Sequence, residues 1–295
     1  MRSQVAFFPV ETHFKGWAKP GPVPRGAGSD PDLPGGVTLD AISGHFRIFQ
    51  LRKGHRFSTD DVLTAWYGTS WCPSAARVLD LGSGIESVGM IAAWRLPGAR
   101  FVTIEAQAES VDLARRSAVY NGLEGRYEIR HGDFRDATAL AADERFDLVL
   151  GSPPYFPPGT GIEGDHPQKV ACRFELRGDI GDYARVAAAH LAPGGLFACV
   201  FPEEQRERVE GAAAGGPPEG GPHNDAELTI VRRRPVVFRQ GERPLIGLYA
   251  MMRTVDLPGR LHGATWIEPP LVIRAADGSI HPEYAAVKLS VGFPP

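Results

Sequence analysis

Strand-like and helix-like segments alternate between residues 76 and 201, and this alternation limits the possible folds more than any other feature of the sequence. Apolar runs of strand length stand at 76–82, 100–106, 127–133, 146–152 and 195–201. Segments with a helical apolar period lie between some of them, at 87–96, 108–122 and 179–192. Strands that alternate with helices form a parallel sheet covered on both faces. We therefore expect an α/β fold with a doubly wound, mostly parallel sheet.

The two ends of the chain depart from this alternation. Residues 228–239 and 244–253 are strand-like runs joined by a short Gly-containing link, which predicts an antiparallel C-terminal hairpin. Residues 15–36 are rich in Pro and Gly and lack an apolar period, so we expect residues 1–36 to be extended or disordered. Residues 37–295 would form one domain with a lead-in at 37–75. A second Gly/Pro-rich stretch at 211–225 predicts a flexible loop.

Composition excludes several classes of protein. The chain has 295 residues and a net charge of −3, so its overall charge does not call for a polyanionic partner. Its cysteines (Cys72, Cys172, Cys199) are far apart, which argues against a disulfide framework or a zinc site and favours the cytoplasm. No apolar run approaches the roughly 18 residues of a membrane span. The histidines lack metal-ligand spacing, so we expect no metal. The oligomeric state stays open.

Three consecutive strand ends carry residues suited to a nucleoside. Gly82 and Gly84 stand between the first strand and its helix, where glycine lets the backbone approach a ligand at a helix N-terminus. Glu105 ends the second strand, at the distance where an acidic side chain accepts both hydroxyls of a ribose. Asp133 ends the third strand and could meet an adenine amino group. Because parallel strands end at one edge of the sheet, these residues predict a nucleoside-binding crevice there.

The fourth strand ends in an unusual corner, Ser152-Pro153-Pro154-Tyr155. Two adjacent prolines stiffen the backbone and remove two amide donors, so their carbonyls can only accept hydrogen bonds. The corner falls at the same edge of the sheet as the crevice. A rigid, acceptor-rich corner of this kind suits a ligand that offers hydrogen-bond donors.

Together these motifs resemble the class I S-adenosylmethionine-dependent methyltransferases, whose fold is Rossmann-like. More narrowly, they are similar to the tRNA adenine-N6 methyltransferases that modify valine tRNA. The resemblance covers about residues 37–295 and includes "GHRFSTDDVLTAWYG" before the glycine turn, "KVACRFE" after the corner and "PPLVIRAADGSIHPEYAA" near the C-terminus. Release-factor glutamine methyltransferases share the Pro-Pro-Tyr motif but normally carry a separate helical N-terminal domain, for which this sequence has no pattern.

The resemblance implies a cofactor, a target and a set of site residues. The cofactor is S-adenosylmethionine, and the partner is RNA, with tRNA favoured. In this family the corner grips an exocyclic amino group, and Tyr155 would stack on the base. The implied catalytic residues are Ser152, Pro153, Pro154 and Tyr155. The candidate cofactor residues are Asp80, Gly82, Ser83, Gly84, Glu86, Glu105, Ala106, Asp133, Phe134, Thr59 and Asp60. The candidate substrate residues are Phe156, Lys169 and Arg173.

Two residues depart from the family pattern and keep alternatives open. Position 152 is usually Asn or Asp, and the Ser form is familiar in cytosine-N4 DNA methyltransferases. Glu86 replaces the third glycine of the turn, where a side chain would suffer if the backbone needs a positive φ. Three interpretations of Glu86 stay open. Its carboxylate would lie near the methionine carboxylate of the cofactor, or it would pair with the methionine ammonium, or it would indicate a binding protein without catalytic activity. A protein glutamine amide is the remaining alternative substrate.

Basic residues cluster outside the motifs. They gather at 47–56 and at 231–239 with Arg243, interleaved with aromatic residues (Phe46, Phe49, Phe57, Phe238). Such clusters are typical either of a nucleic-acid footprint or of a solvated face. An unpaired RNA loop base would suit a small electropositive footprint better than a long duplex would.

Overall fold

The computed structural model describes residues 10–29, 31–160, 166–215, 227–261 and 264–295. Its main sheet has the strand order β12-β10-β11-β9-β8-β5-β6-β7, and β13 also pairs with β10. The strands are β5 (Arg77–Leu81), β6 (Arg100–Glu105), β7 (Tyr127–His131), β8 (Phe146–Gly151), β9 (Leu191–Pro202), β10 (Leu228–Arg239), β11 (Ile246–Arg253), β12 (Trp266–Ile267) and β13 (Leu271–Arg274).

The predicted topology is confirmed. Strands β5 to β9 are mutually parallel, whereas β11 runs antiparallel to both β9 and β10. The order of strands reverses at β5, which lies between β6 and β8. In doubly wound sheets, ligands bind outside the carboxyl ends of the strands at such a switch point.

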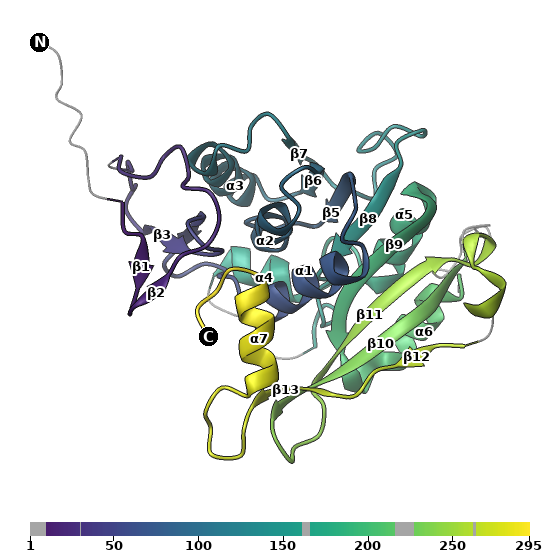
Figure 1. Ribbon diagram of the computed structural model, residues 1–295. Helices are drawn as coiled ribbons and strands as arrows, with labels where there is room; N and C mark the ends of the chain where they lie inside the picture. Colours follow the sequence, from purple (N-terminus) through teal and green to yellow (C-terminus); the bar gives the residue numbers. More distant parts are fainter. Residues whose placement is uncertain (1–9, 30, 161–165, 216–226, 262–263) are drawn as a thin grey trace, which may run out of the picture.

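Helices cover both faces of the sheet (Figure 1). They are α1 (Thr59–Trp71), α2 (Ser87–Arg95), α3 (Ala108–Asn121), α4 (Pro167–Arg173), α5 (Ile180–His190), α6 (Arg206–Ala213) and α7 (Pro282–Ser290). Short 3-10 turns stand at Glu203–Gln205, Thr254–Asp256 and Gly259–Leu261. Helix α5 ends before the predicted residue 192, because β9 begins at Leu191, earlier than predicted.

Alternate residues of the central strands pack in two apolar clusters, as the pleat of a strand requires. Val78 and Leu148 belong to the cluster that includes residues of α1, α2 and α3. Leu79 and Val149 belong to the cluster that includes residues of α5 and α6. Both sides of the sheet are therefore buried, and its carboxyl edge is left to form a site.

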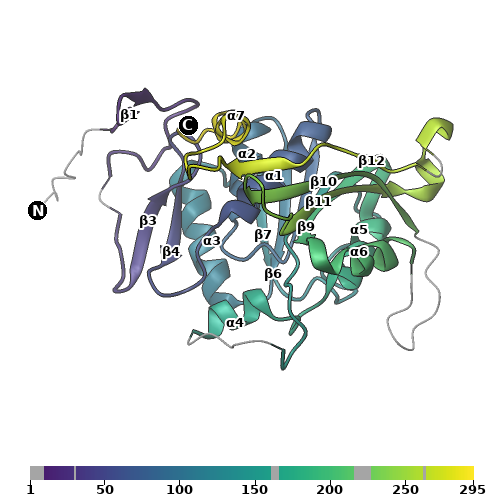
Figure 2. The same ribbon diagram turned by 90° about the horizontal axis from the view of Figure 1, so that it is seen from below.

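The lead-in contains a hairpin of β3 (Val37–Ala41) and β4 (Arg47–Leu51). Its edge is bonded to α3: the Phe49 amide donates to the Ser117 hydroxyl at 3.0 Å, and the Arg47 amide donates to the Asn121 side chain at 3.0 Å. Figure 2 shows this hairpin at the end of the molecule opposite to β10 and β12. The sequence pattern did not predict it, because neither strand is flanked by a helical period.

Two Pro/Gly-rich stretches differ from expectation. The N-terminal stretch contains the strands β1 (His13–Phe14) and β2 (Trp17–Ala18), and the Gly26 amide donates to the Tyr120 carbonyl at 2.9 Å. The predicted boundary at residue 36 stays a prediction. In the expected loop at 211–225, α6 continues to Ala213, and residues 216–225 lie outside the described residues.

Candidate functional site

A cavity of about 300 Å³ opens at the carboxyl ends of β5, β6 and β8. It brings together most of the residues that the sequence singled out, from the glycine turn to the corner. Those on its wall are Asp60, Asp80, Gly82, Ser83, Gly84, Glu105, Ala106, Asp133, Phe134, Ser152, Pro153, Pro154, Tyr155, Phe156 and Arg173. Three candidates, Thr59, Glu86 and Lys169, do not line it.

The glycine turn follows β5 and needs glycine at two positions. Gly82 and Gly84 have φ angles of 58° and 56°, in the left-handed region that favours glycine. A side chain at position 82 would run into the hydroxyl of Tyr183, a residue of α5. At Gly84 the position of a side chain is open space. The turn thus leaves backbone exposed to the cavity.

Glu105 clamps this turn to the end of β6. One carboxylate oxygen accepts the Gly84 amide at 2.9 Å, and the other accepts the Gln107 amide at 2.6 Å. Burial raises the pKa of Glu105, and these two amides oppose that shift. Each carboxylate oxygen keeps a second acceptor site, so Glu105 can receive two further donors from the cavity.

Asp133 lies on the cavity wall but is already paired. Arg135 donates to both carboxylate oxygens of Asp133, with a shortest contact of 2.6 Å, and this hydrogen bonding lowers the pKa of Asp133. The sequence did not predict this partner. Asp133 can still accept a donor from the cavity, because each oxygen has two acceptor positions.

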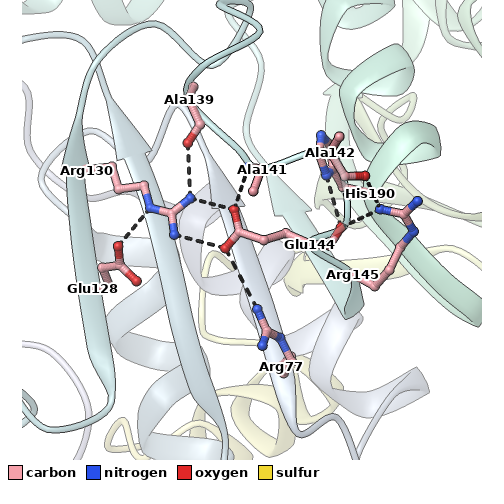
Figure 3. A network of polar contacts seen from close by, with 9 residues as sticks. All are labelled: Arg77, Glu128, Arg130, Ala139, Ala141, Ala142, Glu144, Arg145 and His190. Atoms are coloured by element: carbon pink, nitrogen blue, oxygen red, sulfur yellow. Dashed lines mark hydrogen bonds and ion pairs between the residues drawn. The ribbon is translucent and has the colours of Figure 1, made fainter.

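The loop after Asp133 is anchored to the sheet by a network around Glu144 (Figure 3). Arg130 of β7 donates to both Glu144 oxygens at 2.8 and 2.9 Å, and the Ala141 amide donates at 2.8 Å. The Arg130 hydrogen bonds lower the pKa of Glu144 to about 2. The network fixes the later part of the loop that begins at the cavity with Asp133 and Phe134.

Glu86 does not lie where it could meet the methionine carboxylate or the methionine ammonium of a cofactor in the cavity. Its backbone has a φ of 73°, the positive value at which a side chain was expected to be unfavourable. Its side chain is fully buried and does not line the cavity. The carboxylate accepts hydroxyl hydrogen bonds from Ser83 at 2.8 Å, Thr103 at 2.6 Å and Tyr127 at 2.7 Å. Burial raises its pKa to about 7. Glu86 thus braces the turn from beneath.

Asp80 is a lining residue of the cavity whose carboxyl group is almost fully buried. It is 1% exposed, and its Oδ2 has no hydrogen-bond partner among the described residues. Burial raises the pKa of Asp80 well above its usual range, and the nearby charges of Glu86 and Asp61 raise it further. The Gly89 amide of α2 opposes this rise, and Oδ2 lies against Gly89, so Asp80 packs beneath the turn and supports it there.

The corner is held from behind by the end of α4 with the residues after it, and by the 3-10 turn that precedes α6. The Tyr155 and Phe156 amides both donate to the Arg173 carbonyl at 3.2 Å, and the Glu175 amide donates to the Phe156 carbonyl at 2.9 Å. Gln205 donates to the Tyr155 carbonyl at 3.1 Å. The neighbouring backbone is fixed, and the corner lines the cavity.

The Tyr155 side chain is fixed in turn by α1. Its hydroxyl donates to Asp60 Oδ2 at 2.6 Å, and its ring packs edge-on against Phe201 with centroids 5.7 Å apart. Burial raises the pKa of Asp60. Asp60 entered the candidate set through the resemblance, and the structure joins it to the corner by this bond.

Further cavity residues were not predicted from the sequence. They are His55, Ser58, Asp61, Ile85, Ser87, Val88, Gln107, Gly132, Ala171, Cys172, Arg177 and Tyr183. Arg177 stands two residues after the "KVACRFE" motif, so its basic charge was the signal available. Lys169 is exposed on α4 and does not line the cavity, whereas the Arg173 guanidinium lies 5.7 Å from the Phe156 ring centroid.

The predicted basic clusters are mostly structural. Arg233 pairs with Glu203, Arg234 with Glu283, and Arg56 with Asp40. The interleaved aromatics are not free platforms: Phe46 and Phe49 are core residues, and Phe57 and Phe238 pack against that core.

A metal-binding cluster and a membrane-spanning helix are both absent from the described part of the chain. It contains no group of three or more His, Cys, Asp and Glu side chains arranged to hold a metal ion. Within the same residues, no helix combines the length and the apolar character needed to cross a membrane.

Comparisons with known proteins agree with this geometry. A family model described as "Methyltransferase small domain" matches residues 69–169. A tRNA1(Val) (adenine(37)-N6)-methyltransferase of Porphyromonas gingivalis is 29% identical over 54% of this chain and 64% of its own length. A release factor glutamine methyltransferase of Caulobacter vibrioides is 32% identical over 46% of this chain and 48% of its own length.

The fold has a solved counterpart. The crystal structure of a "predicted O-methyltransferase" from Agrobacterium tumefaciens matches with a TM-score of 0.56, at 18% identity, over 80% of this chain and 98% of that one. The family model covers the glycine turn, the acidic strand ends and the corner, all of which meet at the cavity. Residues 69–169 therefore match a methyltransferase small domain, and the chain has the fold of the class I S-adenosylmethionine-dependent methyltransferases.

Proposed function

We propose that this protein transfers a methyl group from S-adenosylmethionine to an exocyclic amino group, with adenine N6 in tRNA as the favoured target. One observation carries the proposal: the glycine turn and the Ser152–Tyr155 corner open onto the same cavity. A cofactor held at the first would present its methyl group to a target held at the second.

The residues at the turn fit this cofactor. Glu105 has acceptor positions left for the two ribose hydroxyls, and the open space at Gly84 leaves room for a ligand against the backbone. When bound, S-adenosylmethionine would supply a methyl group made electrophilic by its sulfonium.

The corner would prepare the target nitrogen. The Ser152 hydroxyl and a carbonyl of the Pro-Pro step would accept the two amino hydrogens, which directs the nitrogen lone pair toward the methyl group. The nitrogen–carbon bond forms as the carbon–sulfur bond breaks, and the nitrogen releases one proton to water. A strong general base is unnecessary because the electrophile is already cationic, so positioning and electrostatics provide the rate.

Two substrate classes compete for this site. An adenine in tRNA is supported by the Porphyromonas gingivalis relative and by Arg173 and Arg177 on the cavity wall, whose charges suit a phosphate backbone. A protein glutamine amide is supported by the Caulobacter vibrioides relative. We favour RNA, and with it the cytoplasm, because these two exposed arginines would serve a polyanion.

A transfer assay with tritiated S-adenosylmethionine tests the proposal. Total tRNA, rRNA, DNA and release factors would be offered separately, and labelled products would be hydrolysed and identified. We expect label in tRNA that elutes as N6-methyladenosine. Label in release-factor glutamine would instead assign the second class. An absence of label in every substrate, with the cofactor bound, would contradict methyl transfer to an amino group.

A further inference from the structure

A second cavity, of about 500 Å³, lies at the opposite side of the first turn of α1. It is bounded by the ends of β10 and β13 and by α7. Its charged lining consists of Arg239, Arg274, Lys288 and one carboxylate, Glu242. We call this cavity the basic pocket. Its three cations are not explained by the methyl-transfer site.

The two arginines are neighbours in the sheet and lack acidic partners. Arg239 and Arg274 are register partners on the parallel strands β10 and β13, where like charges repel. Among the described residues neither forms an ion pair, and the only carboxylate in the lining, that of Glu242, belongs to an exposed residue. The preceding arginines of β10 differ, since Arg233 and Arg234 are both neutralised.

Lys288 of α7 adds a third positive charge to the same pocket. Lys288 lines the pocket together with Arg274, and burial and the charge of Arg274 both lower the pKa of Lys288. The Arg274 Nη1 donates to the Gly278 carbonyl at 2.9 Å, which fixes the guanidinium while leaving its other donors for a ligand. Three converging cations with free donors form a site for an anion.

The basic pocket adjoins the methyl-transfer cavity through α1. Thr59 lines the basic pocket and Asp60 lines the other cavity, and the Cα atoms of successive residues are about 3.8 Å apart. Tyr284 also lines the basic pocket; burial raises its pKa, and the charge of the neighbouring Asp60 raises it further. An extended ligand could therefore reach both cavities.

We propose that the basic pocket binds a backbone phosphate of the RNA substrate, close to the nucleotide that enters the methyl-transfer cavity. This rests on the proposed function, because it assigns a contact for its polyanionic substrate. Phosphate contacts fix the register of a nucleic acid, whereas base contacts specify its sequence. With a net charge of −3, the protein would rely on such a local site instead of a global positive field.

Salt-dependent binding of an unmodified valine tRNA transcript tests this assignment. Arg239→Gln, Arg274→Gln and Lys288→Gln should each raise the Kd roughly threefold to tenfold and reduce the slope of log K against log salt by about 0.7–0.9. Arg243→Gln is the matched control, since Arg243 is an exposed arginine of the adjacent turn that does not line the pocket. Glu242→Gln should tighten binding, because it removes the only carboxylate of the lining.

Several outcomes would overturn the assignment without affecting the proposed function. If wild type methylates tRNA while the three variants bind it like Arg243→Gln, the basic pocket does not contact RNA. If Glu242→Gln weakens binding as much as the arginine variants do, the effects are structural. If inorganic phosphate binds wild type but not Arg274→Gln while their RNA affinities are equal, the occupant is a free phosphate compound. Failure of wild type to bind or methylate any RNA would instead reject the RNA substrate itself.

Discussion

Glu86 occupies a backbone position that normally favours glycine, and its side chain contacts explain how it is tolerated. Three hydroxyls donate to the carboxylate, from Ser83, Thr103 and Tyr127. These bonds offset the cost of a left-handed non-glycine residue, which is on the order of 1 kcal/mol. Glu86, which the sequence pattern suggested would disturb cofactor binding, therefore stabilises the glycine turn.

The buried Glu86 carboxylate should make stability depend on pH. Its folded pKa is raised to about 7 from 4.5, so the folded state holds a proton that the unfolded state releases. This contribution is fully present below pH 4.5 and is lost as pH rises through about 7. Compared with Glu86→Gln, wild type should lose roughly 1–3 kcal/mol of unfolding free energy over this range.

Urea unfolding of both proteins at several pH values between these limits measures that difference. Parallel curves for wild type and Glu86→Gln would show that Glu86 does not carry a perturbed proton. Because the side chain points away from the cavity, Glu86→Gln should also keep the Kd for S-adenosylmethionine within a few-fold.

Ser152 and Tyr155 should affect methyl transfer more than cofactor binding. Ser152→Ala removes the acceptor for the target amino group, so transfer should fall roughly tenfold to a hundredfold at an unchanged cofactor Kd. Tyr155→Ala should be more severe, because it also removes the ring that would stack on the base. Ser152→Asn restores the residue usual in the family and should retain activity. Unchanged transfer by both alanine variants would make the corner purely structural.

At the scale of elements, α6 determines how firmly the corner is held. Arg208 of α6 donates to Gln205 at 2.8 Å and to Glu175 at 2.6 Å. Gln205 in turn donates to the Tyr155 carbonyl, and the Glu175 amide donates to Phe156. Arg208 thus connects two separate supports of the corner and acts as a positioning residue.

Arg208→Gln should lower kcat for methyl transfer roughly threefold to thirtyfold, because small displacements of a positioned group slow a reaction steeply. Its cofactor Kd should not change, since Arg208 does not line the cavity. Arg185→Gln on α5 is the control, as Arg185 pairs only with Asp182 in the described chain. Equal kcat values for the two variants would show that the corner does not need this support.

The elements that could be predicted from the sequence are those with a local signal. Strand–helix alternation predicted the parallel sheet. The cavity was predicted from Gly82, Glu105 and Asp133, because these residues stand at the ends of adjacent strands. The β3–β4 hairpin could not be predicted, since its edge is satisfied by Ser117 and Asn121 of a helix far along the chain. The orientation of the Glu86 side chain could not be predicted either, because its hydrogen-bond partners come from separate elements.

At the scale of the whole molecule, the first turn of α1 joins the two cavities. Asp60 fixes Tyr155 on one side, while Thr59 lines the basic pocket on the other. The lead-in before β5 therefore belongs to the site, although its residues lie outside the strand–helix repeat. A substrate that fills both cavities would contact residues from both ends of the described chain.

Calorimetric titration with S-adenosylmethionine tests the central claim, that the turn at Gly82–Gly84 and Glu105 form a cofactor site, most directly. We predict that wild type binds the cofactor and that Glu105→Ala, which removes the acceptor for the ribose hydroxyls, binds it roughly tenfold to a hundredfold more weakly. Glu109→Ala, at an exposed position of the first turn of α3, should bind like wild type. An absence of binding by wild type at millimolar cofactor would contradict the account.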